Sequence, residues 1–278
     1  MSANAAAKAL KALHVPSKPT IFSNIWDLSS FNAIASLNTS TSQPVKAVAT
    51  ASWAIAAALG LADEELSLDQ NLALVRSVAP AAVKAGLPLS TDLQDGYGDR
   101  IEEVVTEAIK AGASGANIED SIPSAGFDKG FSGSLYAKDD QVRRLKLAFK
   151  AAAAAGVPDF VVNARTDVFR LNESPDLDDK TRLEEAIARG QAYLEAGATT
   201  IFVWGGPRGL RTHEVESLVK AFDGRLAVLA SGKPGGHTTA ELAKIGVARI
   251  SIGPALYLRA LNTIKETATK MLEGGGLA

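Results

Sequence analysis

The feature that most constrains the fold is a series of short apolar segments that alternate with longer helical segments along the whole chain. The apolar segments are continuous, which is typical of strands buried on both faces of a parallel sheet. Several helical segments end in glycine after alanine or isoleucine, a common helix C-terminus. The eight predicted strands cover residues 20–25, 45–50, 87–91, 115–118, 160–163, 199–203, 226–229 and 249–252.

Eight strand–helix units in a chain of 278 residues predict an α/β fold, a closed (β/α)8 barrel of the TIM type. A doubly wound open sheet is the alternative, but it usually has fewer strands and a glycine-rich GxGxxG turn after the first one, and no such turn follows residue 25. No linker rich in Pro, Gly or Ser divides the chain, so we expect a single domain over residues 1–278. Within it, residues 1–18 are expected as an N-terminal helical extension and 254–272 as a C-terminal helix.

The composition excludes several classes of function. The formal net charge of −2 provides no electrostatic attraction toward nucleic acid or an anionic membrane. The absence of cysteine excludes disulfides, thiolate zinc sites and a cysteine nucleophile, and three histidines make a multi-histidine metal site improbable. The most apolar stretch, residues 48–62, is broken by polar residues and is expected in the core, not in a membrane. No basic segment followed by an apolar one opens the sequence, so we expect no signal peptide and a cytoplasmic protein.

Two carboxylates and an arginine follow predicted strands, where the active residues of such barrels lie. Asp92 follows the third strand, Glu119 the fourth and Arg165 the fifth. Oxygen ligands without cysteine or histidine select Mg²⁺ or Mn²⁺, and few protein ligands leave positions for water and a chelating substrate. An arginine fork suits a carboxylate or phosphonate. The sequence therefore predicts a metal-held small anionic substrate, such as a 2-oxo acid, and an enolate that the metal stabilises when a neighbouring bond breaks.

Other strand ends carry polar or aromatic residues that complete the predicted pocket. Thr50 to Ser52 follow the second strand, Trp204 follows the sixth and is expected as a pocket wall, and Ser231 follows the seventh. The glycine-rich segment 231–237 with Lys233 is an alternative site, because barrel loops in this region often bind phosphate. The chain would then be a phosphate-ligand barrel that does not depend on Asp92.

Each candidate residue also has a structural interpretation that needs no ligand. A carboxylate near a helix start often caps it, and charged residues at strand ends often pair with one another. These interpretations are helix capping for Asp92 and Asp95, an exposed loop pair for Glu119 and Asp120, an ion pair across the barrel for Arg165 and Asp167, and a helix start for Ser52.

In order and position, the motifs at these strand ends resemble those of the isocitrate lyase/phosphoenolpyruvate mutase superfamily. The resemblance covers nearly the whole chain, from residue 24 to the final helix. The individual pieces are moderate signals, and their order at successive strand ends makes the combination specific. The matching pieces are residues 24–27, 49–52, 59–63, 92–98, 118–120 and 163–167, together with the glycine loop after the seventh strand.

The resemblance implies a Mg²⁺-dependent barrel enzyme that forms or cleaves C–C or P–C bonds next to a 2-oxo acid. It also implies a homodimer or homotetramer in which the last helix, residues 254–272, is exchanged between subunits. The roles it implies are Asp92 as direct metal ligand, Glu119 and Asp63 as water-mediated metal contacts, the Ser52 and Trp53 amides as the grip on the substrate carboxylate, and Arg165 as the substrate-binding arginine. Further candidates are Trp26, Asp27, Thr50, Asn163, Trp204 and Ser231 for substrate binding, and Tyr97, Tyr136 and His237 as proton donors, with Tyr97 counted as catalytic.

With three departures from the superfamily pattern, the chain resembles its short phosphoenolpyruvate phosphonomutase-like branch. The loop 121–136 lacks the catalytic cysteine of the isocitrate lyases, Gln94 stands where a second acid is common, and Trp204 stands where His or Glu is common. The leading hypothesis is a Mg²⁺-dependent lyase or hydrolase that cleaves a C–C bond, with P–C cleavage as a second option. The alternative is a barrel that binds a metabolite without catalysis, or the phosphate-ligand barrel that uses residues 231–237.

Overall fold

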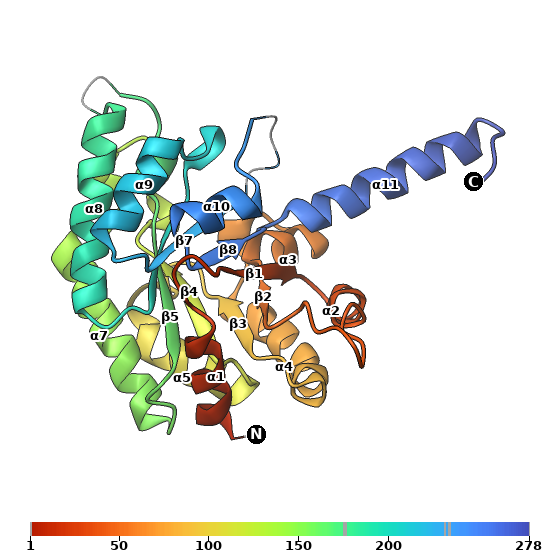
Figure 1. The fold of residues 1–278 in the computed structure, drawn as a ribbon, viewed down its shortest axis with the longest axis horizontal. Helices are drawn as coiled ribbons and strands as arrows, with labels where there is room; N and C mark the ends of the chain where they lie inside the picture. The colour runs from red at the N-terminus through yellow and green to blue at the C-terminus, as the bar shows by residue number, and fades with distance from the viewer. Residues whose placement is uncertain (1, 175–176, 231, 233–234, 278) are drawn as a thin grey trace.

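Eight parallel strands close into a barrel in the order of the chain, with β8 paired to β1 (Figure 1). The computed structural model describes residues 2–174, 177–230, 232 and 235–277. The closed barrel confirms the fold class predicted from the alternating segments. The strands are β1 Thr20–Ile25, β2 Val48–Thr50, β3 Leu89–Asp92, β4 Gly115–Glu119, β5 Val161–Thr166, β6 Thr200–Val203, β7 Leu226–Leu229 and β8 Arg249–Ser251.

Helices surround the barrel and connect successive strands. The α-helices are α1 Ala3–Ala12, α2 Leu28–Ala35, α3 Ser52–Ala58, α4 Leu68–Ala85, α5 Ile101–Ala111, α6 Gly130–Ser134, α7 Lys138–Ala154, α8 Asp179–Glu195, α9 Thr212–Ala221, α10 Thr239–Ile245 and α11 Ala255–Leu272. Short 3-10 helices precede several of them: η1 Asp63–Glu65, η2 Gly98–Arg100, η3 Pro123–Ala125, η4 Val168–Arg170 and η5 Gly206–Arg208.

The N-terminal end of the barrel is closed by α1. Its Leu10 is fully buried and packs with Phe22 of β1 and Val161 of β5 in a small apolar cluster. A Cβ on Gly115 would lie 2.8 Å from the Leu10 side chain and 2.6 Å from the Val161 carbonyl oxygen, so only glycine fits at the start of β4. This apolar plug leaves the C-terminal ends of the strands as the side on which a cavity opens.

The segment after β4, expected as a plain loop over residues 121–136, contains η3 and α6. Its two ends lie together, because the Ile122 N–H donates to the Ser134 carbonyl and the Tyr136 N–H donates to the Asp120 carbonyl. Leu135, near the end of the segment, is buried. The segment is therefore anchored at its base, and its helices are too short to show a period in the sequence.

Helix α11 extends away from the barrel, and none of its residues is buried (Figure 1). It exposes large apolar side chains at Leu258, Leu261, Ile264, Met271 and Leu272. Only its base contacts the body of the protein, where Tyr257 packs edge-on against Trp26 and Trp53. Within the described residues, no helix is both long and apolar enough to cross a membrane.

Candidate functional site

A cavity of about 260 Å³ opens at the C-terminal ends of the strands and brings together seven of the predicted site residues. Its walls come from widely separated segments of the chain, as expected where parallel strands end at one rim. The predicted residues that line it are Thr50, Ser52, Trp53, Asp63, Asp92, Arg165 and Trp204.

Asp92 is the last residue of β3 and is fixed by the segment after β2. Its Oδ2 accepts hydrogen bonds from both the backbone N–H and the hydroxyl of Ser52, each at 3.1 Å. Its own N–H donates to the Thr50 hydroxyl at 2.8 Å, and its carbonyl accepts from the Asn71 amide at 2.8 Å. The carboxylate is thus oriented toward the cavity instead of capping the next helix.

Asp63 lies on the same cavity and is held by Gln94, the residue that replaces a second acid in the 92–98 motif. The Gln94 amide donates to the Asp63 side chain at 3.1 Å and also to its carbonyl. Burial raises the pKa of Asp63, and the nearby Asp92 charge raises it further. Gln94 therefore supports a carboxylate on the cavity wall without adding a negative charge of its own.

Glu119 and Arg165 are partners in the register of β4 and β5, and they form an ion pair of 2.8 Å. Asp167 holds the other side of the guanidinium, at 2.7 Å from Nε and 2.9 Å from Nη2. Burial lowers the pKa of Arg165, but the charges of Asp167 and Glu119 outweigh it and the net shift is upward. Burial raises the pKa of the Glu119 carboxyl well above its ordinary value, although Arg165 opposes this. Arg165 is therefore a cation whose charge two carboxylates balance.

The remaining carboxylates of the motifs are structural. Asp95 accepts from the backbone N–H groups of Tyr97 and Gly98 and from the Tyr136 hydroxyl at 2.8 Å, which holds the turn. Asp120 is fully buried and accepts from the Tyr193 hydroxyl at 2.9 Å, from Arg189 of α8 and from the backbone N–H of Asp167, just after β5.

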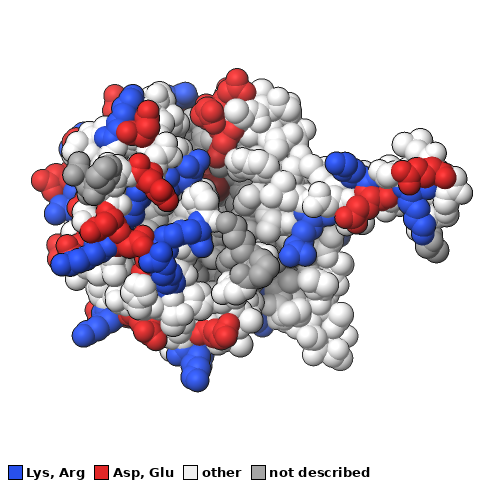
Figure 2. Space-filling model, turned by 90° about the horizontal axis from the view of Figure 1, so that it is seen from above, with Lys and Arg blue, Asp and Glu red and all other residues white. Residues whose placement is uncertain are grey.

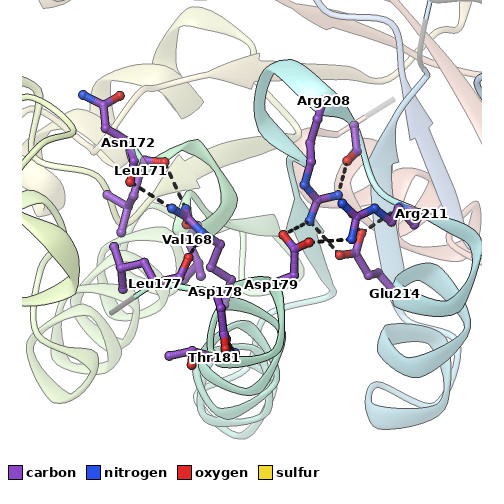
Figure 3. Close-up of polar contacts among 12 residues, drawn as sticks. Val168, Leu171, Asn172, Leu177, Asp178, Asp179, Thr181, Arg208, Arg211 and Glu214 are labelled. Atoms are coloured by element: carbon purple, nitrogen blue, oxygen red, sulfur yellow. Dashed lines mark hydrogen bonds and ion pairs between the residues drawn. The ribbon is translucent and has the colours of Figure 1, made fainter. Parts of the chain in front are cut away.

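The loops that follow β5 and β6 are tied to each other by a charged network (Figure 3). Arg208 pairs with Asp179, the first residue of α8, at 3.0 Å and with Glu214 of α9 at 2.6 Å. Arg211 reaches the same Asp179 carboxylate. Nearby, Arg182 donates to four carbonyls in the two turns before α8, those of Val168, Leu171, Asn172 and Leu177. These contacts anchor the chain on either side of Trp204.

Trp204 forms one wall of the cavity between two arginines. Its ring lies 5.0 Å from the Arg165 guanidinium and 5.4 Å from that of Arg170. Both distances are within cation–π range. The indole therefore lies against the predicted substrate-binding arginine, in the position of a wall.

Several predicted residues do not line this cavity. Trp26 packs against Tyr257, Asp27 caps α2 by accepting from the Ser30 N–H, and Asn163 is buried in hydrogen bonds to Asn117 and Thr200. The other three are Tyr97, whose hydroxyl accepts from Asn71, Tyr136, whose hydroxyl donates to Asp95, and His237, whose ring contacts the Thr212 hydroxyl. Glu119 reaches the cavity through its partner Arg165. Ser231 and Lys233 lie outside the described residues.

One charged residue of the cavity was missed by the sequence analysis, along with several neutral ones such as Asn117 and Ser251. Arg249, the first residue of β8, is buried and lines the cavity below the level of the strand ends. The signal was a lone charged residue in an otherwise apolar predicted strand, residues 249–252. Buried arginine without a partner is rare, so a charge at this point in a buried strand indicates that it faces a polar group or a ligand.

The chemistry of the donor set fits a divalent cation of the Mg²⁺ type. Asp92 and Asp63 supply carboxylate oxygens on one cavity, and their mutual repulsion would be relieved by a cation. No group of three His, Asp or Glu side chains within the described ranges is close enough to hold a metal. Mg²⁺ commonly uses one or two carboxylates and completes its shell with water and substrate oxygens.

Comparison with known protein families identifies the chain. A family model described as phosphoenolpyruvate phosphomutase matches residues 10–272. This match confirms the resemblance inferred from the motifs at the strand ends.

Two enzymes and one solved structure illustrate the relationship. The 2-methylisocitrate lyase of Escherichia coli K12 is 34% identical over 151 residues, which is 53% of this chain and 46% of that enzyme, so the match spans less than half of the enzyme's length. The phosphonopyruvate hydrolase of Variovorax sp. Pal2 is 27% identical over 76% of this chain and 70% of its own length. The crystal structure of a candidate phosphonomutase from Burkholderia cenocepacia J2315 is 34% identical and covers 99% of this chain and 100% of its own, with a TM-score of 0.81.

Proposed function

The chain belongs to the phosphoenolpyruvate phosphomutase family, and from that premise we propose that it is a lyase or hydrolase that depends on Mg²⁺ or Mn²⁺. Its substrate is a small 2-oxo acid or an adduct of one, in which a C–C bond next to the 2-oxo group breaks. The observation that carries this proposal is the convergence of Asp92, Asp63 and Arg165 on one cavity at the strand ends. Relatives named as a lyase and as a hydrolase of such acids support the same class of chemistry.

Asp92 and Asp63 would hold the cation, with Glu119 acting through water. When bound, Mg²⁺ supplies a Lewis acid that stabilises negative charge developing on the 2-oxo oxygen. The two hydrogen bonds from Ser52 fix the Asp92 carboxylate and leave its Oδ1 for the cation. Such outer hydrogen bonds orient a metal ligand.

The substrate carboxylate would be held by Arg165 and by the backbone N–H of Trp53. A guanidinium has five N–H donors, and three contacts with Glu119 and Asp167 leave donors for a substrate. The Trp53 N–H lies in the first turn of α3, where backbone N–H groups have no acceptor within the helix. The Trp204 ring covers the arginine and excludes water from that side.

The acid that protonates the product differs from the thiol of the isocitrate lyases, because the chain contains no cysteine. Tyr97 and Tyr136 are poor candidates for this acid. Burial raises the pKa of each, and neither lines the cavity. We assign the proton to bulk solvent, which suits a reaction whose enolate product leaves the cavity before it is protonated.

The test is turnover of oxaloacetate, 2-methylisocitrate and phosphonopyruvate by the purified protein, with Mg²⁺ and with excess EDTA. We expect activity on at least one of these acids, its loss in EDTA, and a loss on the order of a hundredfold or more in Asp92→Asn, because a transition-state charge would lose its stabilisation. Asp99→Asn is the matched control, since Asp99 is exposed and close in sequence. Full activity in EDTA or in Asp92→Asn would show that the metal mechanism is wrong. Binding of these acids with no turnover on any of them would favour the non-catalytic alternative.

A further inference from the structure

The two arginines of the cavity differ in how their charge is balanced. Arg165 has two carboxylate partners within 3 Å. Arg249 is 1% exposed, and the nearby Asp92, whose charge raises the pKa of Arg249, forms no hydrogen bond or ion pair with it. A buried cation without a counter-charge in direct contact is strongly unfavourable. Arg249 therefore needs an explanation that a structural ion pair does not supply.

The contacts of the Arg249 guanidinium are weak. Nη1 lies 3.4 Å from His14 Nε2, Nη2 lies 3.4 Å from the Ser90 hydroxyl, and Nε has no hydrogen-bond partner. The group stacks at 3.9 Å over the Phe22 ring, which fixes its plane. Burial lowers its pKa to about 9, so it stays charged at neutral pH. The result is a fixed cation with donor capacity that the protein does not use.

The position of Arg249 places this capacity at the floor of the proposed active site. Arg249 begins β8, whereas Asp92 ends β3, and both line the same cavity. Ser90, which contacts Arg249, precedes Asp92 by two residues on one strand face, a rise of about 7 Å. A molecule held at Asp92 and extending downward would meet the guanidinium.

We propose that Arg249 binds the far carboxylate of a diacid substrate, whose 2-oxo acid end lies beside Asp92 and Arg165. This inference rests on the proposed function and names the substrate class as 2-oxo diacids rather than monoacids. The carboxylate supplies a counter-charge in direct contact with Arg249, which Asp92 does not provide, and charge-assisted hydrogen bonds to a planar guanidinium are strong and directional. A substrate with a methyl group at that end would leave the cation unpaired.

The experiment compares acids that differ only at the far end. Dissociation constants are measured by calorimetry with Mg²⁺ for oxaloacetate against 2-oxobutyrate and for 2-oxoglutarate against 2-oxovalerate. For at least one of these two pairs, we expect the wild-type protein to bind the diacid at least about tenfold more tightly than the monoacid of the same length. In Arg249→Met, this preference should fall to about twofold or less, while the affinity for the monoacid is kept. Arg76→Met, at an exposed arginine, should change neither.

Two results would overturn the inference: no diacid preference in the wild-type protein, or an equal preference in Arg249→Met. If Arg249→Met does not fold, a crystal structure of the wild-type protein with the tighter diacid decides the question. The far carboxylate should then lie within hydrogen-bond distance of the Arg249 guanidinium. A carboxylate placed elsewhere would contradict the inference. If neither kind of acid binds, the proposed function itself is wrong. If monoacids bind as tightly as diacids, the role proposed for Arg249 is wrong and the proposed function is unaffected.

Discussion

At the scale of single residues, the charged side chains inside the barrel differ in how far the sequence predicts their positions. Asp92 and Arg165 could be predicted from the sequence, because residues at the ends of parallel strands meet at one rim. Arg249 stands out in the sequence only as a lone charge in an apolar strand, since its neighbours His14, Phe22 and Ser90 come from three separate segments and no local pattern connects them. Its role follows from burial and missing partners, which only the folded chain reveals.

His14 gives a prediction about pH at this scale. Burial, and then the charge of Arg249, lower its pKa from the ordinary value of 6.5 to about 3. The unfolded chain therefore binds a proton between pH 6.5 and 3 that the folded protein does not, and stability falls as pH falls through this window. Above about pH 6.5 this contribution is fully present.

Between pH 7 and pH 5, we expect the free energy of unfolding of His14→Gln to fall less than that of the wild-type protein. The difference between the two losses should be at most about 2 kcal/mol, because the His14 side chain is only partly buried. Urea unfolding at the two pH values measures the difference. His213→Gln, at an exposed histidine, should keep the wild-type pH dependence. The explanation is wrong if His14→Gln and wild type lose equal stability.

At the scale of elements, the loops that carry the site depend on charged anchors more than on local pattern. The turn after β3 was predictable from its glycines, and Asp95 serves it as expected for a turn carboxylate. The charged network of Figure 3 was not, because Arg208, Asp179 and Glu214 come from three elements whose proximity depends on closure of the barrel.

Arg208→Met should destabilise the protein by about 2 kcal/mol. Glu214 is fully buried and would lose its cation, although its bond from the Arg211 N–H remains and Arg208 is itself partly exposed. Arg143→Met removes an exposed pair with Asp140 and should cost about 0.5 kcal/mol or less. Urea denaturation compares the two, and equal small losses would show that the network carries little energy.

At the scale of the whole molecule, the barrel itself was the most predictable feature, because eight buried strands with helices between them leave few other folds. The sequence of α11 by itself shows only that one face is apolar, and it was the resemblance to a known superfamily that led us to expect this helix to pack on a partner. Figure 2 shows charges of both signs interspersed over the part of the barrel that lies away from α11. Few charged side chains lie beside the base of α11 in this view. An apolar face without cover on its own chain indicates a partner.

We propose that this partner is a second copy of the chain and that α11 packs on it in a homodimer or homotetramer. Light scattering coupled to size exclusion should find an oligomer for the wild-type protein at micromolar concentration. Leu261→Asp should shift it toward the monomer, because a charge on the exposed apolar face opposes burial. Thr263→Asp, away from that face, should not. A wild-type monomer would contradict the proposal.

The central claim is that the cavity at Asp92 is a divalent-metal site for a 2-oxo acid. A crystal structure with Mg²⁺ and oxalate, a mimic of the enolate of a 2-oxo acid, tests it most directly. We predict a metal bound to the Asp92 carboxylate, with oxalate between it and the Trp53 N–H and Arg165. Oxalate in the 232–237 segment, or a cavity without metal at saturating Mg²⁺, would contradict the claim.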